Sequence, residues 1–130
     1  MTTNYQKIYE RLGYLFYAIA AADRVVSTAE VEKLKEMVRK LWVPAEDSMD
    51  EFGTDAAQYI TISFDYLMNE GVDPEIAFEE FTNYYNEHKG VFTPELRRNI
   101  KYTAQALAKA FKGQNKREAE LIAELESVLG

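Results

Sequence analysis

The sequence predicts an all-α fold, and three observations lead to that prediction. Apolar residues recur at the spacing of a helix face through most of the 130 residues. Residue types that commonly begin helices stand before these stretches, and glycines that commonly end helices follow them. The chain also has the usual length of one domain. We therefore expect a single compact helical domain over residues 1–130, built from six or seven helices.

Two helices are expected in the first third of the chain. The first is predicted over residues 4–22 and the second over residues 27–42, with Ser27 capping the second. Their apolar faces are Ile8, Leu12, Leu15 and Ile19 in the first helix, and Val31, Leu34, Val38 and Leu41 in the second. Residues 43–54 follow as the one long connection that we expect.

The middle of the chain contains one ambiguous stretch, "YITISF" at residues 59–64. Its alternating pattern would suit a β-strand, but no second strand candidate exists to pair with it. A helix from Thr54 or Asp55 to Asn69 explains the pattern better and would end at Gly71. That helix places four apolar residues on one face: Ala57, Ile60, Phe64 and Leu67.

Three further helices are predicted in the second half. Asp73-Pro74 and Thr93-Pro94 each combine a capping residue with proline at the first helical position. The helices that they begin should extend to about Lys89 and Lys112, each stopping at the following glycine. The last helix should run from Asn115 to about Leu129. Because most connections are short, we expect helices that are neighbours in sequence to pack antiparallel.

Charge limits the partners of this protein. Fifteen basic residues against 22 acidic residues give a net charge of -7. Nucleic acids and anionic membrane surfaces are disfavoured, because phosphate binding needs a clustered basic face. A divalent metal or a cationic partner fits the balance better. No apolar run reaches the ~18 residues of a spanning helix, so we expect no insertion into a membrane.

The residue types also limit the chemistry. The chain has no cysteine and one histidine, His88, which excludes thiolate catalysis and any multi-histidine metal site within one chain. We find no nucleophile motif and no glycine-rich phosphate loop. We therefore expect no enzymatic activity and no small-molecule substrate. The lack of cysteine is compatible with the cytoplasm, which we take as the expected location.

The two ends of the chain resemble each other. A shift of 88 positions places Ile8 on Leu96 and the alanines at 18, 20 and 22 on those at 106, 108 and 110. It also places Ser27…Glu30 on Asn115…Glu118. Each of these pairs has the spacing of a capping box, in which the cap and the glutamate satisfy each other's free backbone amides. We interpret the ends as two related helical hairpins.

Asp23 and Glu30 are the candidate metal ligands. Both flank the turn between the first two helices, where a hard cation could bind carboxylates together with backbone carbonyls. The alternative is structural, with Glu30 bonded to the amide of Ser27 and Asp23 bonded to free amides of the turn. A second, acidic stretch offers Asp47 and Asp50 as fallback ligands. Its alternative is a solvated acidic loop.

The stretch "AIAAADRVVSTAEVEKLKEMV" at residues 18–38 resembles the TerB-like family, named for tellurite-resistance proteins. The family pattern is an alanine-rich helix, Asp-Gly, a short turn and a helix with Glu seven positions after the Asp. Asp23 and Glu30 match it in type and spacing, and residues 107–130 resemble the second hairpin of the family. The resemblance implies an all-helical domain with internal pseudo-symmetry, acidic residues proposed to bind metal, and a role in stress response. Family members include stand-alone proteins and domains fused to others, among them J-domain co-chaperones.

Two positions depart from the family pattern: Arg24 replaces its usual glycine, and Phe111 occupies the place that would match Asp23 in the second hairpin. A symmetric pair of acidic sites is therefore not expected. The leading functional expectation is a non-enzymatic binding or scaffold domain in a stress-response or metal-ion context. The alternatives are a divalent-metal binder through Asp23 and Glu30, and a homodimerising module that uses an aromatic surface without a ligand.

Overall fold

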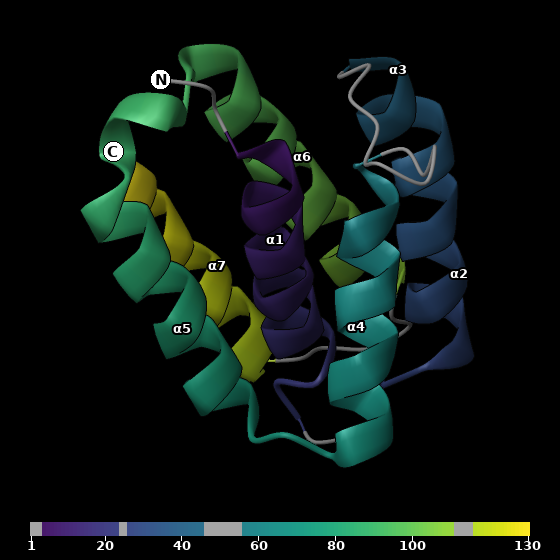
Figure 1. Ribbon diagram of the computed structural model, residues 1–130. Helices are drawn as coiled ribbons and strands as arrows, with labels where there is room; N and C mark the ends of the chain where they lie inside the picture. Colours follow the sequence, from purple (N-terminus) through teal and green to yellow (C-terminus); the bar gives the residue numbers. More distant parts are fainter. Residues whose placement is uncertain (1–3, 24–25, 46–55, 111–115) are drawn as a thin grey trace.

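The computed structural model of the protein describes residues 4–23, 26–45, 56–110 and 116–130. This part of the chain is all-α and contains no β-strand, as predicted. Figure 1 shows the arrangement of the helices. The long helices are α1 (Tyr5–Ala20), α2 (Thr28–Met37), α4 (Gln58–Glu70), α5 (Pro74–Glu87), α6 (Pro94–Ala110) and α7 (Lys116–Leu129). Shorter pieces are a π-helical turn η1 (Val38–Trp42), α3 (Val43–Ala45) and a 3-10 turn η2 (Lys89–Val91).

The first helix, α1, lies at the centre of the bundle, with α4, α5 and α6 packed against it (Figure 1). Its buried residues are not confined to the predicted stripe but also include Tyr9, Phe16 and Tyr17. All six residues from Leu15 to Ala20 are buried, so this half of the helix must be covered on all sides, whereas Lys7, Glu10 and Arg11 lie on a partly exposed face of the first half. Our expectation that sequence neighbours would pair holds for α6 and α7 but was wrong for α1, whose main contacts are with α4 and α5 rather than with α2. It was also wrong for α5, which packs mainly against α1 rather than against α4 or α6.

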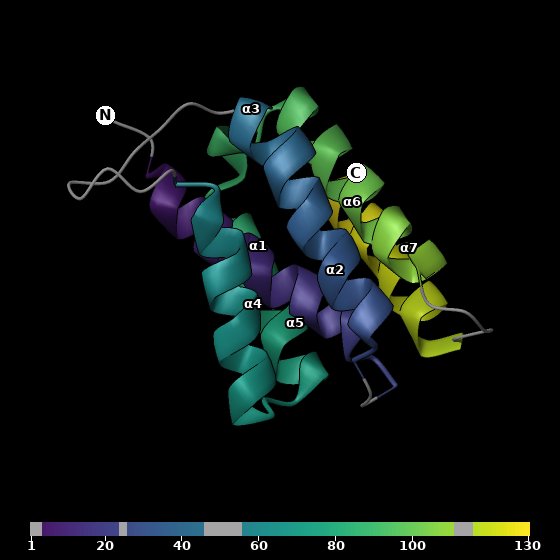
Figure 2. The ribbon, with the colours of Figure 1, turned by 90° about the vertical axis from the view of Figure 1, so that its right-hand side faces the viewer.

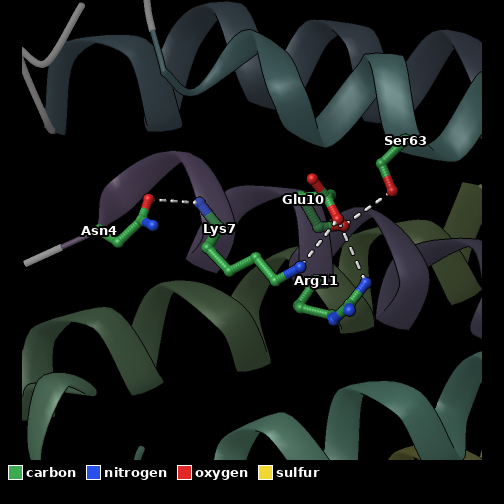
Figure 3. Close-up of polar contacts among 5 residues, drawn as sticks. All are labelled: Asn4, Lys7, Glu10, Arg11 and Ser63. Atoms are coloured by element: carbon green, nitrogen blue, oxygen red, sulfur yellow. Dashed lines mark hydrogen bonds and ion pairs between the residues drawn. The ribbon is translucent and has the colours of Figure 1, made fainter. Parts of the chain in front are cut away.

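The helices α1 and α4 approach each other closely at Gly13. A Cβ atom at this position would lie 2.6 Å from the carbonyl oxygen of Ile60 and 2.6 Å from Cβ of Ser63. The hydroxyl of Ser63 donates a hydrogen bond of 2.8 Å to the backbone carbonyl of Glu10 (Figure 3). A glycine and a small hydroxyl residue thus let the two helices meet backbone to backbone.

The predicted helix over 27–42 is not one regular α-helix. It begins as predicted, but Val38–Trp42 form a π-helical turn, which holds more residues than an α-turn and so changes which side chains face the core. Trp42 is buried, whereas the predicted core residue Leu41 is half-buried. The indole Nε1 of Trp42 donates a 3.0 Å hydrogen bond to Oγ1 of Thr103 on α6.

The other predicted boundaries that fall on described residues agree with the structure within a few residues, whereas Thr54, Asp55, Lys112 and Gly113 lie outside them. "YITISF" is helical within α4, and Gly71 ends this helix with a left-handed φ of 62°. Asp73 caps α5, with its Oδ1 2.8 Å from the amide nitrogen of Glu75. Thr93 caps α6, with Oγ1 3.1 Å from the amide nitrogen of Leu96. The predicted cap Asn115 lies outside the described residues.

The aromatic residues of α5 belong mainly to the core, as their sequence pattern predicts, although some of them could also have covered a dimer interface. Phe78, Phe81 and Tyr85 on α5 are buried, and Tyr84 is half-buried. The rings of Phe81, Tyr84 and Tyr85 pack around Phe92, with ring centroids 4.9 Å apart for Tyr85 and Phe92. Within the described residues, no helix has both the length and the apolar character that crossing a membrane requires.

We predict that Gly13→Ala destabilises the protein, because the new methyl group would overlap the backbone of α4. The expected loss is about 1–3 kcal/mol of the free energy of unfolding, measured by urea denaturation. Gly90→Ala is the matched control, since a Cβ atom there meets nothing within 4 Å. Equal effects of the two substitutions would contradict a close contact at Gly13.

Thr103→Val should also destabilise the protein, because it leaves the buried indole N–H of Trp42 without its acceptor. An unsatisfied buried donor costs about 1–3 kcal/mol. Thr103→Ser keeps the hydroxyl and should retain most of the stability. The two variants can be compared by thermal and urea unfolding; equal loss in both would mean that the methyl group of Thr103, not its hydroxyl, stabilises this contact.

Candidate functional site

Glu30 forms the capping box that the sequence predicts at the start of α2. Its amide nitrogen lies 3.2 Å from Oγ of Ser27, and its Oε1 accepts a bond of 3.2 Å from the amide of Ser27. The hydroxyl of Ser27 also lies 2.9 Å from Oε1. Glu30 is 0% exposed, which is rare for a carboxylate. The capping box accounts for the burial of one carboxylate oxygen of Glu30, Oε1, but not for that of the other, Oε2.

The second buried acid is Glu118, in the first turn of α7, and it lies beside Glu30. Its side chain is 2% exposed, and its pKa is raised to about 9. Burial is the largest cause of this raised pKa, followed by the hydrogen bond with Glu30, the charge of Glu30 and the charge of Asp23. Three acids from the end of α1, the start of α2 and the start of α7 therefore interact.

These three places lie at one end of the bundle. Figures 1 and 2 show the end of α1 and the first turns of α2 and α7 on the same lower side of the molecule. Asp23 is exposed in the turn that follows α1, while Glu30 and Glu118 are buried beneath it. The arrangement is a buried carboxyl pair with a third acid at its solvent side.

The buried pair of carboxyl groups requires a proton or a cation between its oxygens. Oε2 of Glu30 has no hydrogen-bond partner among the described residues. Two ionised carboxylates are acceptors only, so a hydrogen bond between Glu30 and Glu118 forms only when one of them holds a proton. The same demand can be met by a bound cation. Without a shared proton or a bound cation, ionisation of both carboxyl groups is unfavourable, because the two negative charges repel each other and are shielded from water.

The described residues do not form a complete metal site. No group of three or more histidine, aspartate or glutamate side chains is close enough to hold an ion within the residues that the structure describes. Oε1 of Glu30 is already used by Ser27. A cation between Glu30 and Glu118 would need Asp23 to turn toward it, or backbone carbonyls and water to complete its shell.

Sequence reasoning identified Asp23 and Glu30 but did not place Glu118 in the site. We interpreted Glu118 only as the capping partner of Asn115, which the structure does not describe. The sequence did indicate a shared role for Glu118 and Glu30, because the shift of 88 residues superposes one on the other. The fallback ligands Asp47 and Asp50, and also Arg24, lie outside the described residues.

Fold and site together define an all-helical domain with a buried carboxyl pair at one end. No protein-family model, curated protein or solved structure matches this chain. The function must therefore be argued from the geometry and from the residues themselves.

The raised pKa of Glu118 predicts how stability depends on pH. A carboxyl group with a pKa of about 9 when folded and 4.5 when unfolded favours the folded state most below pH 4.5. That contribution is lost as the pH rises toward 9, by up to about 1.4 kcal/mol per pH unit. Glu118→Gln cannot ionise, so its stability relative to the natural chain should increase from pH 5 to pH 9.

Urea unfolding in a metal-free buffer across this pH range measures the difference. Glu124→Gln, on an exposed position of the same helix, is the control and should follow the natural chain at every pH. Parallel pH profiles for Glu118→Gln and the natural chain would show that Glu118 ionises as easily in the folded state as in the unfolded state.

Proposed function

We propose that the chain is a non-enzymatic TerB-like binding domain whose ligand is a divalent cation held by Asp23, Glu30 and Glu118. The observation that carries this proposal is the buried pair, Glu30 and Glu118, with Asp23 near enough for its charge to raise the pKa of Glu118. Within the described residues, one oxygen of Glu30 lacks a hydrogen-bond partner, which is the situation that a cation relieves.

The pairing of Glu30 with Glu118 supports the proposed internal repeat. The two residues superpose under the shift that relates the ends of the chain, and both occupy the third position of a helix. One pair of helix contacts follows the same relation. If α1 corresponds to α6 and α2 to α7, then the contact of α2 with α6 corresponds to that of α7 with α1, and both are present.

A hard divalent cation suits the chemistry of the three acids. Magnesium, calcium and manganese prefer carboxylate, carbonyl and water oxygens. A cation would displace the proton from Glu118, so affinity should rise with pH. The resemblance to the TerB-like family favours a stress-response or metal-ion context, and the lack of cysteine is compatible with the cytoplasm; there the domain would act as a binding or scaffold protein.

Metal titration tests the proposal. At pH 8, one of magnesium, calcium, manganese or zinc at millimolar concentration should raise the melting temperature, and the rise should be smaller at pH 6. A cation present at 100 times its Kd stabilises the folded state by about 2.7 kcal/mol. Isothermal titration calorimetry in two buffers of different ionisation enthalpy should detect the released proton.

Asp23→Asn and Glu118→Gln should each weaken the binding, and both keep the capping box of Ser27 and Glu30 intact. Glu70→Gln, an exposed acid at the end of α4, is the control and should bind as the natural chain does. No change in melting temperature with any of the four metals at pH 8 would refute the cation proposal and leave a carboxyl pair that shares a proton.

A further inference from the structure

A hollow lined by aromatic side chains lies at the end of the bundle opposite the three acids. It forms where the first turns of α1, the turn η1 and the start of α6 come together, at the upper side of Figure 1. The hollow encloses about 210 Å³, which is less than the ~300–1,000 Å³ of sites for drug-sized ligands. It therefore has room for a small ligand or for one side chain of a partner.

Three aromatic rings line the hollow. The rings of Tyr5 and Tyr9 are stacked, with centroids 6.1 Å apart, and Trp42 meets Tyr9 edge-on at 5.9 Å. Tyr9 and Trp42 are buried and lie deepest, whereas Tyr5 is half-buried and is the ring most open to a ligand. The bond from the indole of Trp42 to Thr103 holds the deepest ring in place. The aromatic part of the hollow is therefore formed before any ligand arrives.

The π-helical turn η1 is what brings Trp42 to this position. A regular helical pattern would bury Leu41, whereas the structure leaves Leu41 half-buried and buries Trp42 in its place. Single π-helical turns are frequent at functional sites. The turn is an observation separate from the cavity itself, and both point to the same end of the bundle.

Polar groups with no partner stand beside the rings. Glu95 and Asn99 are four residues apart on α6, and both line the hollow. Within the described residues, neither of these side chains nor the hydroxyl of Tyr5 forms a hydrogen bond or an ion pair. The half-buried side chains of Val91 and Leu96 complete the accessible lining. A ligand would thus meet apolar surface, an amide and one carboxylate together.

We propose that this hollow binds a substituted ammonium group, such as the quaternary ammonium of a small organic cation. Aromatic rings attract such cations, and the methyl groups of the cation pack against apolar side chains such as Val91 and Leu96. Glu95 supplies the opposite charge at the solvent side.

Other classes of ligand fit the hollow less well. An anion would meet the carboxylate of Glu95 in a chain of net charge -7, and no lysine, arginine or histidine of the described residues lines the hollow. An uncharged apolar ligand would leave Glu95 and Asn99 without partners. The hollow uses none of Asp23, Glu30 and Glu118, so this inference goes beyond the proposed cation site and does not depend on it.

Titration with choline tests the inference, with the uncharged isostere of choline, in which carbon replaces nitrogen, as the matched control. Trp42 is the only tryptophan of the chain, so its fluorescence reports on the hollow itself. Choline should change this fluorescence saturably, and ligand-observed NMR should detect the same binding. The isostere should bind about tenfold more weakly, because it lacks the attraction between cation and rings.

A second titration distinguishes two sources of the ammonium group. A short peptide with one trimethyl-lysine is compared with choline and with the same peptide carrying unmodified lysine. Tighter binding of choline would identify a free small molecule as the ligand. Tighter binding of the trimethylated peptide than of choline and of its unmodified twin would identify a modified side chain of a partner protein.

Two substitutions test the residues of the hollow. Tyr5→Leu keeps an apolar side chain but removes the most open ring, and Glu95→Gln removes the charge; each should weaken choline binding by about threefold to fivefold. Tyr102→Leu and Glu124→Gln make the same changes at exposed positions elsewhere and should bind choline as the natural chain does. Melting temperatures confirm that each variant is folded.

Three results would overturn the inference. The first is absence of saturable binding by both choline and the trimethylated peptide. The second is equal affinity for choline and its uncharged isostere, which would make the hollow a purely apolar site. The third is choline binding that neither Tyr5→Leu nor Glu95→Gln alters, which would place the choline elsewhere. A failed metal titration leaves this inference unaffected, and failure of choline to bind leaves the cation site unaffected.

Discussion

The enclosure of α1 is the constraint on which the rest of the structure depends. The six residues of its second half, from Leu15 to Ala20, are all buried and face every direction around the helix axis, so no single partner helix can cover them. α4 and α5 cover much of its surface, and α6 and α7 contact it as well. Gly13 allows α4 to approach closely, which leaves room for the others. Once α1 is enclosed, the ends of the covering helices are fixed in space.

The buried carboxyl pair is a consequence of that enclosure. α2 packs on α6, and α7 packs on both α6 and α1, which brings the first turns of α2 and α7 to the same end. Glu30 and Glu118 each occupy the first turn of a helix, where free backbone amides favour a negative charge. The fold thus buries two acids together, and their ionisation depends on the proton or cation that lies between them.

α7 links this buried site to the surface. Glu118 points into the bundle, whereas Arg117 and Glu120 meet at the surface beside α5. Neighbouring residues at the start of α7 therefore lie in two different electrostatic environments. Burial beside Glu30 raises the pKa of Glu118, while the ion pairs of Arg117 at the surface are open to screening by salt.

Local sequence determined most of the helices of this protein. Caps such as Ser27, Asp73 and Thr93 act within four residues of themselves, so their pattern predicts where helices begin. Only the tertiary structure decided which helices meet, because packing depends on residues far apart in the chain. The π-helical turn that buries Trp42 against Thr103 is one example, since its partner lies 61 residues away. The pairing of Glu30 with Glu118 is another, because a capping glutamate and a buried site glutamate look the same in sequence until the fold brings them together.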